Sequence, residues 1–156
     1  MFAGIASSRR DTDVRVLSLH EDEVERWNTA LQTQQIEVIF HSYKRKCIKS
    51  KPALVTKNPQ EAMQDVEMVV FMTEASSHQV YLEALTSHVK PGTVIVGLPA
   101  DPNFQLQVLQ EFGSACTIIT FESSPWTCRT TEFGVKCEVF GTEDTLLGVI
   151  KVTIFI

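Results

Sequence analysis

Short, largely apolar runs that contain β-branched residues recur along this chain, and segments with helical spacing separate many of them. The runs cover residues 14–19, 36–40, 51–57, 68–72, 93–98 and 116–121. Runs of this length and composition are typical of strands, and the intervening spacing predicts helices over residues 21–34, 76–89 and 103–112. Because a crossover between parallel strands must pass over a face of the sheet, the alternation predicts a doubly wound α/β fold with a mostly parallel sheet.

Two details of this pattern predict where individual strands lie. The run at 68–72, M-V-V-F-M, is uninterrupted and apolar, which is typical of a strand buried on both faces, so we predict that it is the central strand. Residues 43–49 are rich in Lys and Arg and are predicted to form the tip of a hairpin between the strands 36–40 and 51–57. A solvated tip is favoured over a phosphate or partner site there.

Length and charge exclude several classes of function. The 156 residues suffice for one domain with a buried core, and no apolar run approaches the roughly 20 residues of a membrane-spanning helix. A net charge of -5 offers no basic surface for nucleic acid. The 4 cysteines form no C-x-x-C pair and no metal-ligand spacing, so we expect no metal, free thiols and a cytoplasmic location, and no secretion signal opens the chain.

A doubly wound sheet binds ligands beyond the carboxyl ends of its strands, so function is expected in the loops that follow residues 19, 72, 98 and 121. A dinucleotide-binding fold normally begins with a strand and a G-x-G-x-x-G turn, and this chain contains no such turn. Residues 1–9 instead have the composition of a helix end. We therefore expect residues 1–151 to form an incomplete dinucleotide-binding domain that lacks the first strand and the glycine-rich loop.

Several segments at these loops carry a family resemblance. They are G-I-A-S-S-R at 4–9, T-V-I-V-G-L-P at 93–99, F-E-S-S-P-W-T-C-R at 121–129 and E-F-G-V-K at 132–136. Together they resemble the octopine-type opine dehydrogenases of invertebrates, whose pattern at the third segment is F-E-T-L-P-W-x-C-R. The resemblance extends from Gly4 to Lys151, whereas the apolar residues 152–156 do not share it.

This resemblance implies an oxidoreductase with a Rossmann domain followed by a helical substrate domain. Such an enzyme uses NADH to join pyruvate to the amino group of an amino acid, and it regenerates NAD during anaerobic glycolysis. The catalytic His with its acidic partner and the Arg that holds the keto acid have no counterpart here, so we expect no catalytic residue and no helical domain in this chain. The alternative is a non-catalytic remnant or the product of a truncated gene.

The cofactor-binding residues that the resemblance implies lie in the loops after the strands. They are Asp22, Met72, Thr73, Ala75, Gly97 and Pro99. Asp22 or Glu21 would accept hydrogen bonds from the adenosine ribose, although a role at the helix N-terminus competes with this for both. At 73–78 the chain has T-E-A-S-S-H where the family has V-P-A-F-A-H, so polar groups replace an apolar wall, and together with the missing glycine loop this predicts weakened NADH binding.

The implied substrate-binding residues are Asp101, Ser123 and Cys128. Asp101 replaces a family Gln and is expected to repel pyruvate. Ser123 is either a substrate contact or a turn-capping hydroxyl, and Cys128 is either a pocket residue or a buried structural thiol. His78 is expected to be a surface or capping residue, and Trp27 a core residue.

Overall fold

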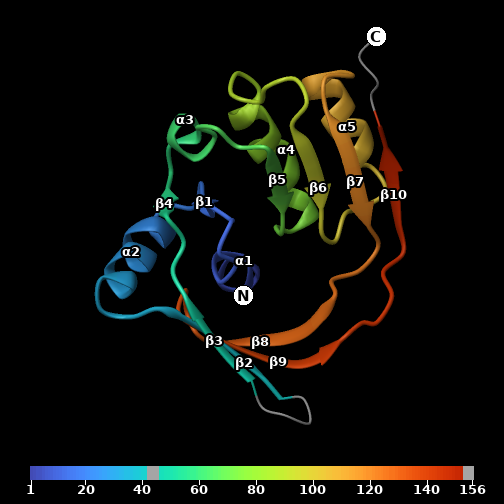
Figure 1. The fold of residues 1–156 in the computed structure, drawn as a ribbon. Coiled ribbons are helices and arrows are strands. Elements are labelled where there is room, and N and C mark those ends of the chain that lie inside the picture. Colours follow the sequence, from blue (N-terminus) through green and yellow to red (C-terminus); the bar gives the residue numbers. More distant parts are fainter. Residues whose placement is uncertain (42–45, 153–156) are drawn as a thin grey trace. The chain divides into compact units, whose positions relative to one another are not determined.

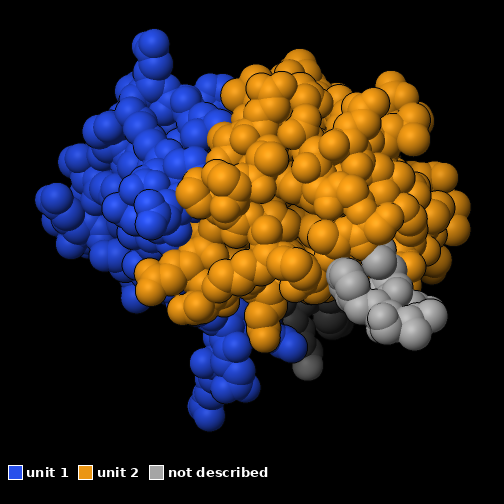
Figure 2. All heavy atoms as spheres, turned by 90° about the horizontal axis from the view of Figure 1, so that it is seen from above, with its two compact units in different colours: residues 1–62, 126–143 blue, residues 63–125, 144–156 orange. Residues whose placement is uncertain are grey.

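The computed structural model describes residues 1–41 and 46–152, and these divide into two compact units. Unit 1 comprises residues 1–62 and 126–143, and unit 2 comprises residues 63–125 and the chain from 144 onward (Figure 2). The predicted single dinucleotide-binding domain over residues 1–151 therefore stays a prediction, and each unit is described by itself.

Unit 1 contains two sheets and three helices. Its smaller sheet pairs β1 (Arg15–Leu17) with β4 (Leu54–Thr56) in parallel. Its larger sheet has the order β3-β2-β9-β8. The strands of that sheet are β2 (Ile36–Phe40), β3 (Lys46–Ser50), β8 (Trp126–Glu132) and β9 (Lys136–Thr142), and the helices are α1 (Phe2–Ser7), α2 (Glu23–Thr33) and α3 (Pro59–Ala62).

The core of unit 1 is aliphatic and joins segments that are distant in sequence. Its buried members are Val24, Leu31, Ile36, Val38, Val55, Val135 and Val139. Trp27 packs against them and is half-buried, as expected for a core residue with a polar edge. Its Nε1 atom donates a hydrogen bond of 2.6 Å to the carbonyl of Gly134, which ties α2 to the turn between β8 and β9.

Unit 2 alternates strand and helix along the chain (Figure 1). Strands β5, β6 and β7 pair in parallel, and β10 adds to β7 in the antiparallel direction. The elements are β5 (Met68–Phe71), α4 (Ala75–Leu85), β6 (Val94–Gly97), α5 (Phe104–Phe112), β7 (Thr117–Phe121) and β10 (Gly148–Lys151). Leu82, Ile95, Phe104 and Val108 have no exposed surface, so they form the centre of this core.

The parallel pairings confirm the predicted α/β fold class, but three local predictions are wrong. The hairpin partner of β2 is β3, whereas residues 54–56 form a separate strand beside β1. The lysines of β3 face solvent, which suits an edge strand, and this is why a basic segment can be a strand. Strand β5 is not central, because β6 is its neighbour on one side and no described strand pairs with its other edge.

The third difference is that the described strands form three sheets rather than one, and the chain between residues 126 and 142 forms a hairpin that we did not predict. The basic tip at 42–45 and the apolar residues 153–156 lie outside the described residues. Among the helices of residues 1–41 and 46–152, none is long and apolar enough to cross a membrane.

Candidate functional site

The carboxyl ends of β5, β6 and β7 meet at one edge of the unit 2 sheet. Figure 1 shows these three strands side by side. Their register places Phe71 beside Gly97 and Gly97 beside Thr120. The loops that follow these strands therefore lie at the same edge, which is where open parallel sheets bind ligands. They carry most of the residues expected at the site, namely Met72, Thr73, Ala75, Gly97, Pro99, Asp101 and Ser123.

Backbone hydrogen bonds hold the loop after β6 against its neighbours. The Leu98 amide donates to the Phe71 carbonyl and the Ala100 amide to the Phe121 carbonyl, both at 2.9 Å. A side chain at Gly97 would place its Cβ 2.5 Å from that of Ala100 and 2.9 Å from the ring of Phe104. The lack of a side chain at Gly97 is thus required by packing, whether or not a cofactor approaches.

Three of the expected cofactor residues surround the start of α4. Met72 is 37% exposed, and Ala75 is exposed as the first residue of the helix. The Oγ1 atom of Thr73 is buried and has no hydrogen-bond partner among the described residues. A buried hydroxyl without a hydrogen-bond partner destabilises the folded state. Of these three residues, Thr73 is therefore the one whose side chain is suited to form a hydrogen bond with a ligand.

His78 is buried, and the prediction of a surface or capping residue is wrong. The residue is 1% exposed, and its ring packs edge-on against Phe71 and Phe104 at centroid distances of 5.9 and 4.9 Å. Its Nε2 atom lies 3.2 Å from the carbonyl oxygen of Thr73. The physical reason is helical spacing, because His78 shares the buried face of α4 with Tyr81, Leu82 and Leu85.

Asp101 faces this buried imidazole. Its Oδ2 atom lies 3.5 Å from Nδ1 of His78, and its Oδ1 atom accepts a hydrogen bond of 2.6 Å from the amide of Asn103. The carboxylate is 26% exposed, while the imidazole is 1% exposed. The Asp101 carboxylate, which we expected to repel pyruvate, therefore interacts with His78 and the Asn103 amide within the protein.

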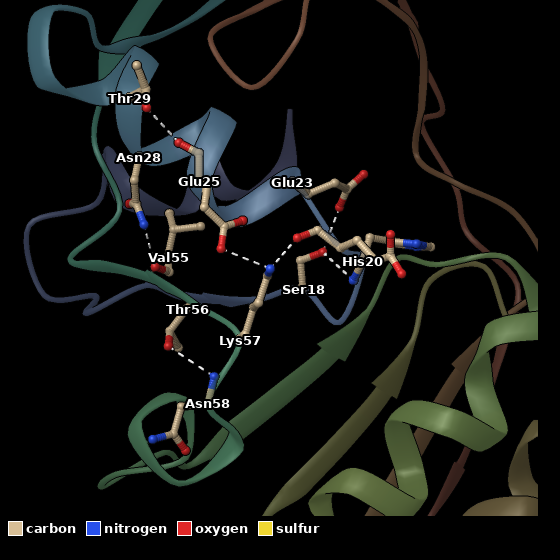
Figure 3. A network of polar contacts seen from close by, with 11 residues as sticks. Ser18, His20, Glu23, Glu25, Asn28, Thr29, Val55, Thr56, Lys57 and Asn58 are labelled. Carbon is tan, nitrogen blue, oxygen red and sulfur yellow. Dashed lines mark hydrogen bonds and ion pairs between the residues drawn. The ribbon is translucent and has the colours of Figure 1, made fainter.

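Unit 1 has a comparable edge where β1 and β4 end together. Figure 3 shows the polar network of Ser18, Glu23, Glu25 and Lys57. The Ser18 hydroxyl donates a bond of 2.6 Å to the Glu23 carboxylate. Lys57 contacts the Glu21 carbonyl and lies 2.9 Å from Oε1 of Glu25. The hydrogen bond from Lys57, together with one from the backbone of Glu25 itself, lowers the pKa of the Glu25 carboxyl below its usual value of 4.5.

Asp22 lies at the N-cap position of α2 in this unit, but its side chain makes no capping hydrogen bond. Its carboxylate pairs with Arg26 at 3.2 Å, one turn along the helix, and both side chains are largely exposed. The carboxylate therefore remains accessible to a ligand. Its assignment to the cofactor stays a prediction.

Cys128 belongs to unit 1 and is exposed on β8, so the alternative of a buried structural thiol is wrong. Cys137 on the adjacent strand is the buried thiol, and burial raises its pKa, with the nearby Cys128 adding to the shift. Ser123 is also exposed. Substrate binding by Ser123 and Cys128 stays a prediction.

Sequence reasoning missed Ser18, Glu23 and Lys57 as a polar network, and it missed the burial of His78. Helical spacing could have identified His78, whereas no sequence signal connects Lys57 to α2. Within the described ranges, no group of three or more His, Cys, Asp and Glu side chains could hold a metal ion.

Comparison with known proteins identifies relatives along almost the whole chain. The sequence is 40% identical to tauropine dehydrogenase from Arabella iricolor over 154 residues, which cover 96% of this chain and 39% of that protein. It is 38% identical to octopine dehydrogenase from Mizuhopecten yessoensis, with coverage of 92% and 37%. No family model matches the chain. The chain thus spans about two fifths of the length of the curated relatives it matches.

Solved structures give the same result. Octopine dehydrogenase with NADH and L-arginine matches with a TM-score of 0.93 and 35% identity over 96% of this chain and 38% of that one. Yersinopine dehydrogenase with NADP+ matches at 0.78 with 9% identity, which shows a shared fold alone. The chain is related in sequence and in its Rossmann-type fold to the octopine-type opine dehydrogenases, and the predicted resemblance is confirmed.

Proposed function

We propose that this relative of the octopine-type opine dehydrogenases provides the NADH-binding part of an enzyme that joins pyruvate to an amino acid. The observation that carries the proposal is the agreement with NADH-bound octopine dehydrogenase at a TM-score of 0.93. The cofactor supplies the hydride that reduces the imine, and the chain supplies binding and orientation. We place this activity in the cytoplasm, where it regenerates NAD during anaerobic glycolysis.

The residues proposed to hold NADH lie at the carboxyl edges of the sheets. Asp22 has an exposed carboxylate suited to ribose hydroxyls, and Thr73 has a buried hydroxyl without a partner among the described residues. Met72, Ala75, Gly97 and Pro99 lie in the same loops or at their start and would surround the cofactor. The chain has no G-x-G-x-x-G turn to receive the pyrophosphate, so we expect weakened binding.

The substrate side of the proposal involves Asp101, Ser123 and Cys128. The hydroxyl of Ser123 is exposed and suited to bind a carboxylate, and the Cys128 thiol is exposed on β8. None of these residues is proposed to transfer protons.

A second candidate function is a non-catalytic, Rossmann-like protein. It is favoured by the polar segment T-E-A-S-S-H at 73–78, which stands where the family has V-P-A-F-A-H and replaces an apolar wall beside the cofactor. The two candidates differ in whether NADH binds at all.

Turnover is the first test. We expect the 156-residue protein to oxidise no NADH with pyruvate plus arginine, glycine, alanine or taurine, because it lacks the acid-base and carboxylate-holding groups that hydride transfer needs. The absorbance of NADH reports this directly. Steady oxidation above the rate without protein would show that the chain is a complete catalyst.

Titration with NADH tests the binding proposal itself. We expect binding that calorimetry detects but that is weaker than in a full-length octopine dehydrogenase measured alongside. Asp22→Asn should weaken it by about tenfold, the value for one hydrogen bond to a charged group. Asp144→Asn, a charge removal at an exposed position of unit 2, serves as the control. No binding by the wild type would favour the non-catalytic candidate, and affinity equal to that of the full-length enzyme would contradict the weakening.

A further inference from the structure

A buried imidazole connects two of the loops at the edge of the unit 2 sheet. His78 reaches the Thr73 carbonyl in the loop after β5 through Nε2 and the Asp101 carboxylate in the loop after β6 through Nδ1. Its other ring contacts are Phe71 and Phe104, which carry no charge. Among the described residues, Asp101 is therefore the charged group that the ring faces, and it favours the protonated ring, whereas burial favours the neutral one.

Hydrogen-bond chemistry restricts the protons on this ring. A carbonyl oxygen only accepts hydrogen bonds, so Nε2 must carry the proton in its contact with Thr73. In a neutral ring, Nδ1 would then present a lone pair to the Asp101 carboxylate at 3.5 Å, which is repulsive. In a doubly protonated ring, the same atoms form an ion pair.

The burial of Nδ1 increases the free-energy difference between the neutral and the doubly protonated ring. Nδ1 is buried and has no well-aligned hydrogen-bond partner among the described residues, so a mismatch with the facing carboxylate is costly there. The 3.5 Å distance is long for a hydrogen bond but within the range of an ion pair. A buried polar group is tolerated when its partner carries the complementary charge.

We propose that His78 is a positioning residue that holds the two loops together as a protonated imidazole and neutralises Asp101. The Asp101 carboxylate also accepts the Asn103 amide at 2.6 Å, so holding it fixes the start of α5 as well. In consequence, the edge of the sheet does not present an uncompensated negative charge to an anionic ligand. This last consequence rests on the proposed function, whereas the charge pair does not.

The charge pair is tested by long-range proton–nitrogen NMR of the intact 156-residue protein at neutral pH. We expect both ring nitrogens of His78 to carry protons in the wild type. In Asp101→Asn, which keeps an oxygen for the Asn103 amide, we expect one proton, on Nε2. A wild-type ring with a bare Nδ1 would overturn the proposal, and so would a ring whose state is the same in both proteins.

The holding of the loops is tested by hydrogen exchange in His78→Asn. We expect the Asn103 amide to exchange at least about tenfold faster, because its acceptor is released, while the Val94 amide, bonded to the Glu67 carbonyl in the sheet, keeps its rate. Equal acceleration at both amides would show general loosening and contradict a positioning role. Asp101→Asn covers the case in which His78→Asn does not fold.

A pyruvate titration separates this inference from the proposed function. The chain lacks the Arg that holds the keto acid in the family, so we expect the wild type to bind pyruvate weakly, through the exposed Ser123 hydroxyl. His78→Asn should weaken this binding by about tenfold more through the uncompensated carboxylate, and the double variant with Asp101→Asn should recover it. A double variant as weak as the single one would contradict the neutralising role. If no form binds pyruvate, the proposed function fails at this site, and the NMR result alone decides the charge pair.

Discussion

Unit 1 and unit 2 differ in how far apart along the chain their paired strands lie. In unit 2, β5, β6 and β7 follow one another and pair with their sequence neighbours in parallel. In unit 1, β2 pairs with β9, and Trp27 bonds to Gly134, which is 107 residues away. Unit 2 is therefore organised by local strand–helix alternation, whereas unit 1 is completed only when the chain returns to it.

The two cores also differ in chemistry. The core of unit 1 consists of aliphatic side chains, while the core of unit 2 includes an imidazole enclosed by Phe71 and Phe104. Both units share one feature, since β1 and β5 each have a single strand partner among the described residues. Such an edge exposes backbone N–H and C=O groups that another strand could pair with.

The largest effects should come from matched cavities in the two cores. Leu82→Ala in unit 2 and Leu31→Ala in unit 1 should each lower the free energy of unfolding by about 2 to 5 kcal/mol. Both leucines are buried, at 0% and 3% exposure, whereas Leu106 on α5 is 58% exposed. Urea unfolding measures the losses, with Leu106→Ala as the control.

Hydrogen exchange in the same variants sharpens the comparison. If the units are separately organised, each cavity should speed exchange mainly in its own unit. Uniform acceleration across both would show that they unfold as one body. A loss in Leu82→Ala no larger than in Leu106→Ala would contradict the assignment of Leu82 to a tightly packed core.

Two glycines with positive φ should show the next effect. Gly134 in unit 1 has φ +72 and would place a Cβ 2.5 Å from the Trp27 ring, whereas Gly92 in unit 2 has φ +90 and open space around it. Gly92→Ala should cost about 1 to 2 kcal/mol through backbone strain alone. Gly134→Ala should cost about 1 to 3 kcal/mol more, since it also displaces Trp27. Equal melting shifts would mean that Trp27 moves aside freely.

The same contrast explains what could be predicted from the sequence. Strands β5, β6 and β7 and helices α4 and α5 of unit 2 follow from apolar runs, helical spacing and stop signals such as Gly113 after α5, whereas β10 was not predicted. The β8–β9 hairpin was not predicted, because Trp126–Glu132 is largely exposed and has no apolar alternation. Its position depends on pairing with β2, which no local pattern encodes.

The candidate site shows the same limit. The predicted doubly wound fold identified the loops after β5, β6 and β7, the family resemblance named residues in them, and the parallel register brings these loops to one edge. The partner of Asp101 was not identified, because it depends on the direction in which the His78 side chain points from α4. The spacing of His78 with Leu82 and Leu85 was sufficient to predict burial, and a helix-face analysis would have found it.

The smallest effect concerns the surface network of unit 1, where Lys57 joins α2 to the segment after β4 (Figure 3). The hydrogen bond from Lys57 lowers the pKa of Glu25 below 4.5, so folding favours the ionised carboxylate. The resulting stability is fully present above pH 4.5 and is lost as the pH falls through the lowered pKa.

Glu25→Gln should therefore lower the urea midpoint slightly at neutral pH and leave it unchanged at strongly acidic pH. Because Glu25 is fully exposed, salt should shrink the difference at neutral pH as well. Glu143→Gln, at an exposed position where no ion pair was found among the described residues, controls for the loss of one negative charge. A difference that grows toward low pH would reverse the sign of the linkage and show that Lys57 does not stabilise the charged form of Glu25.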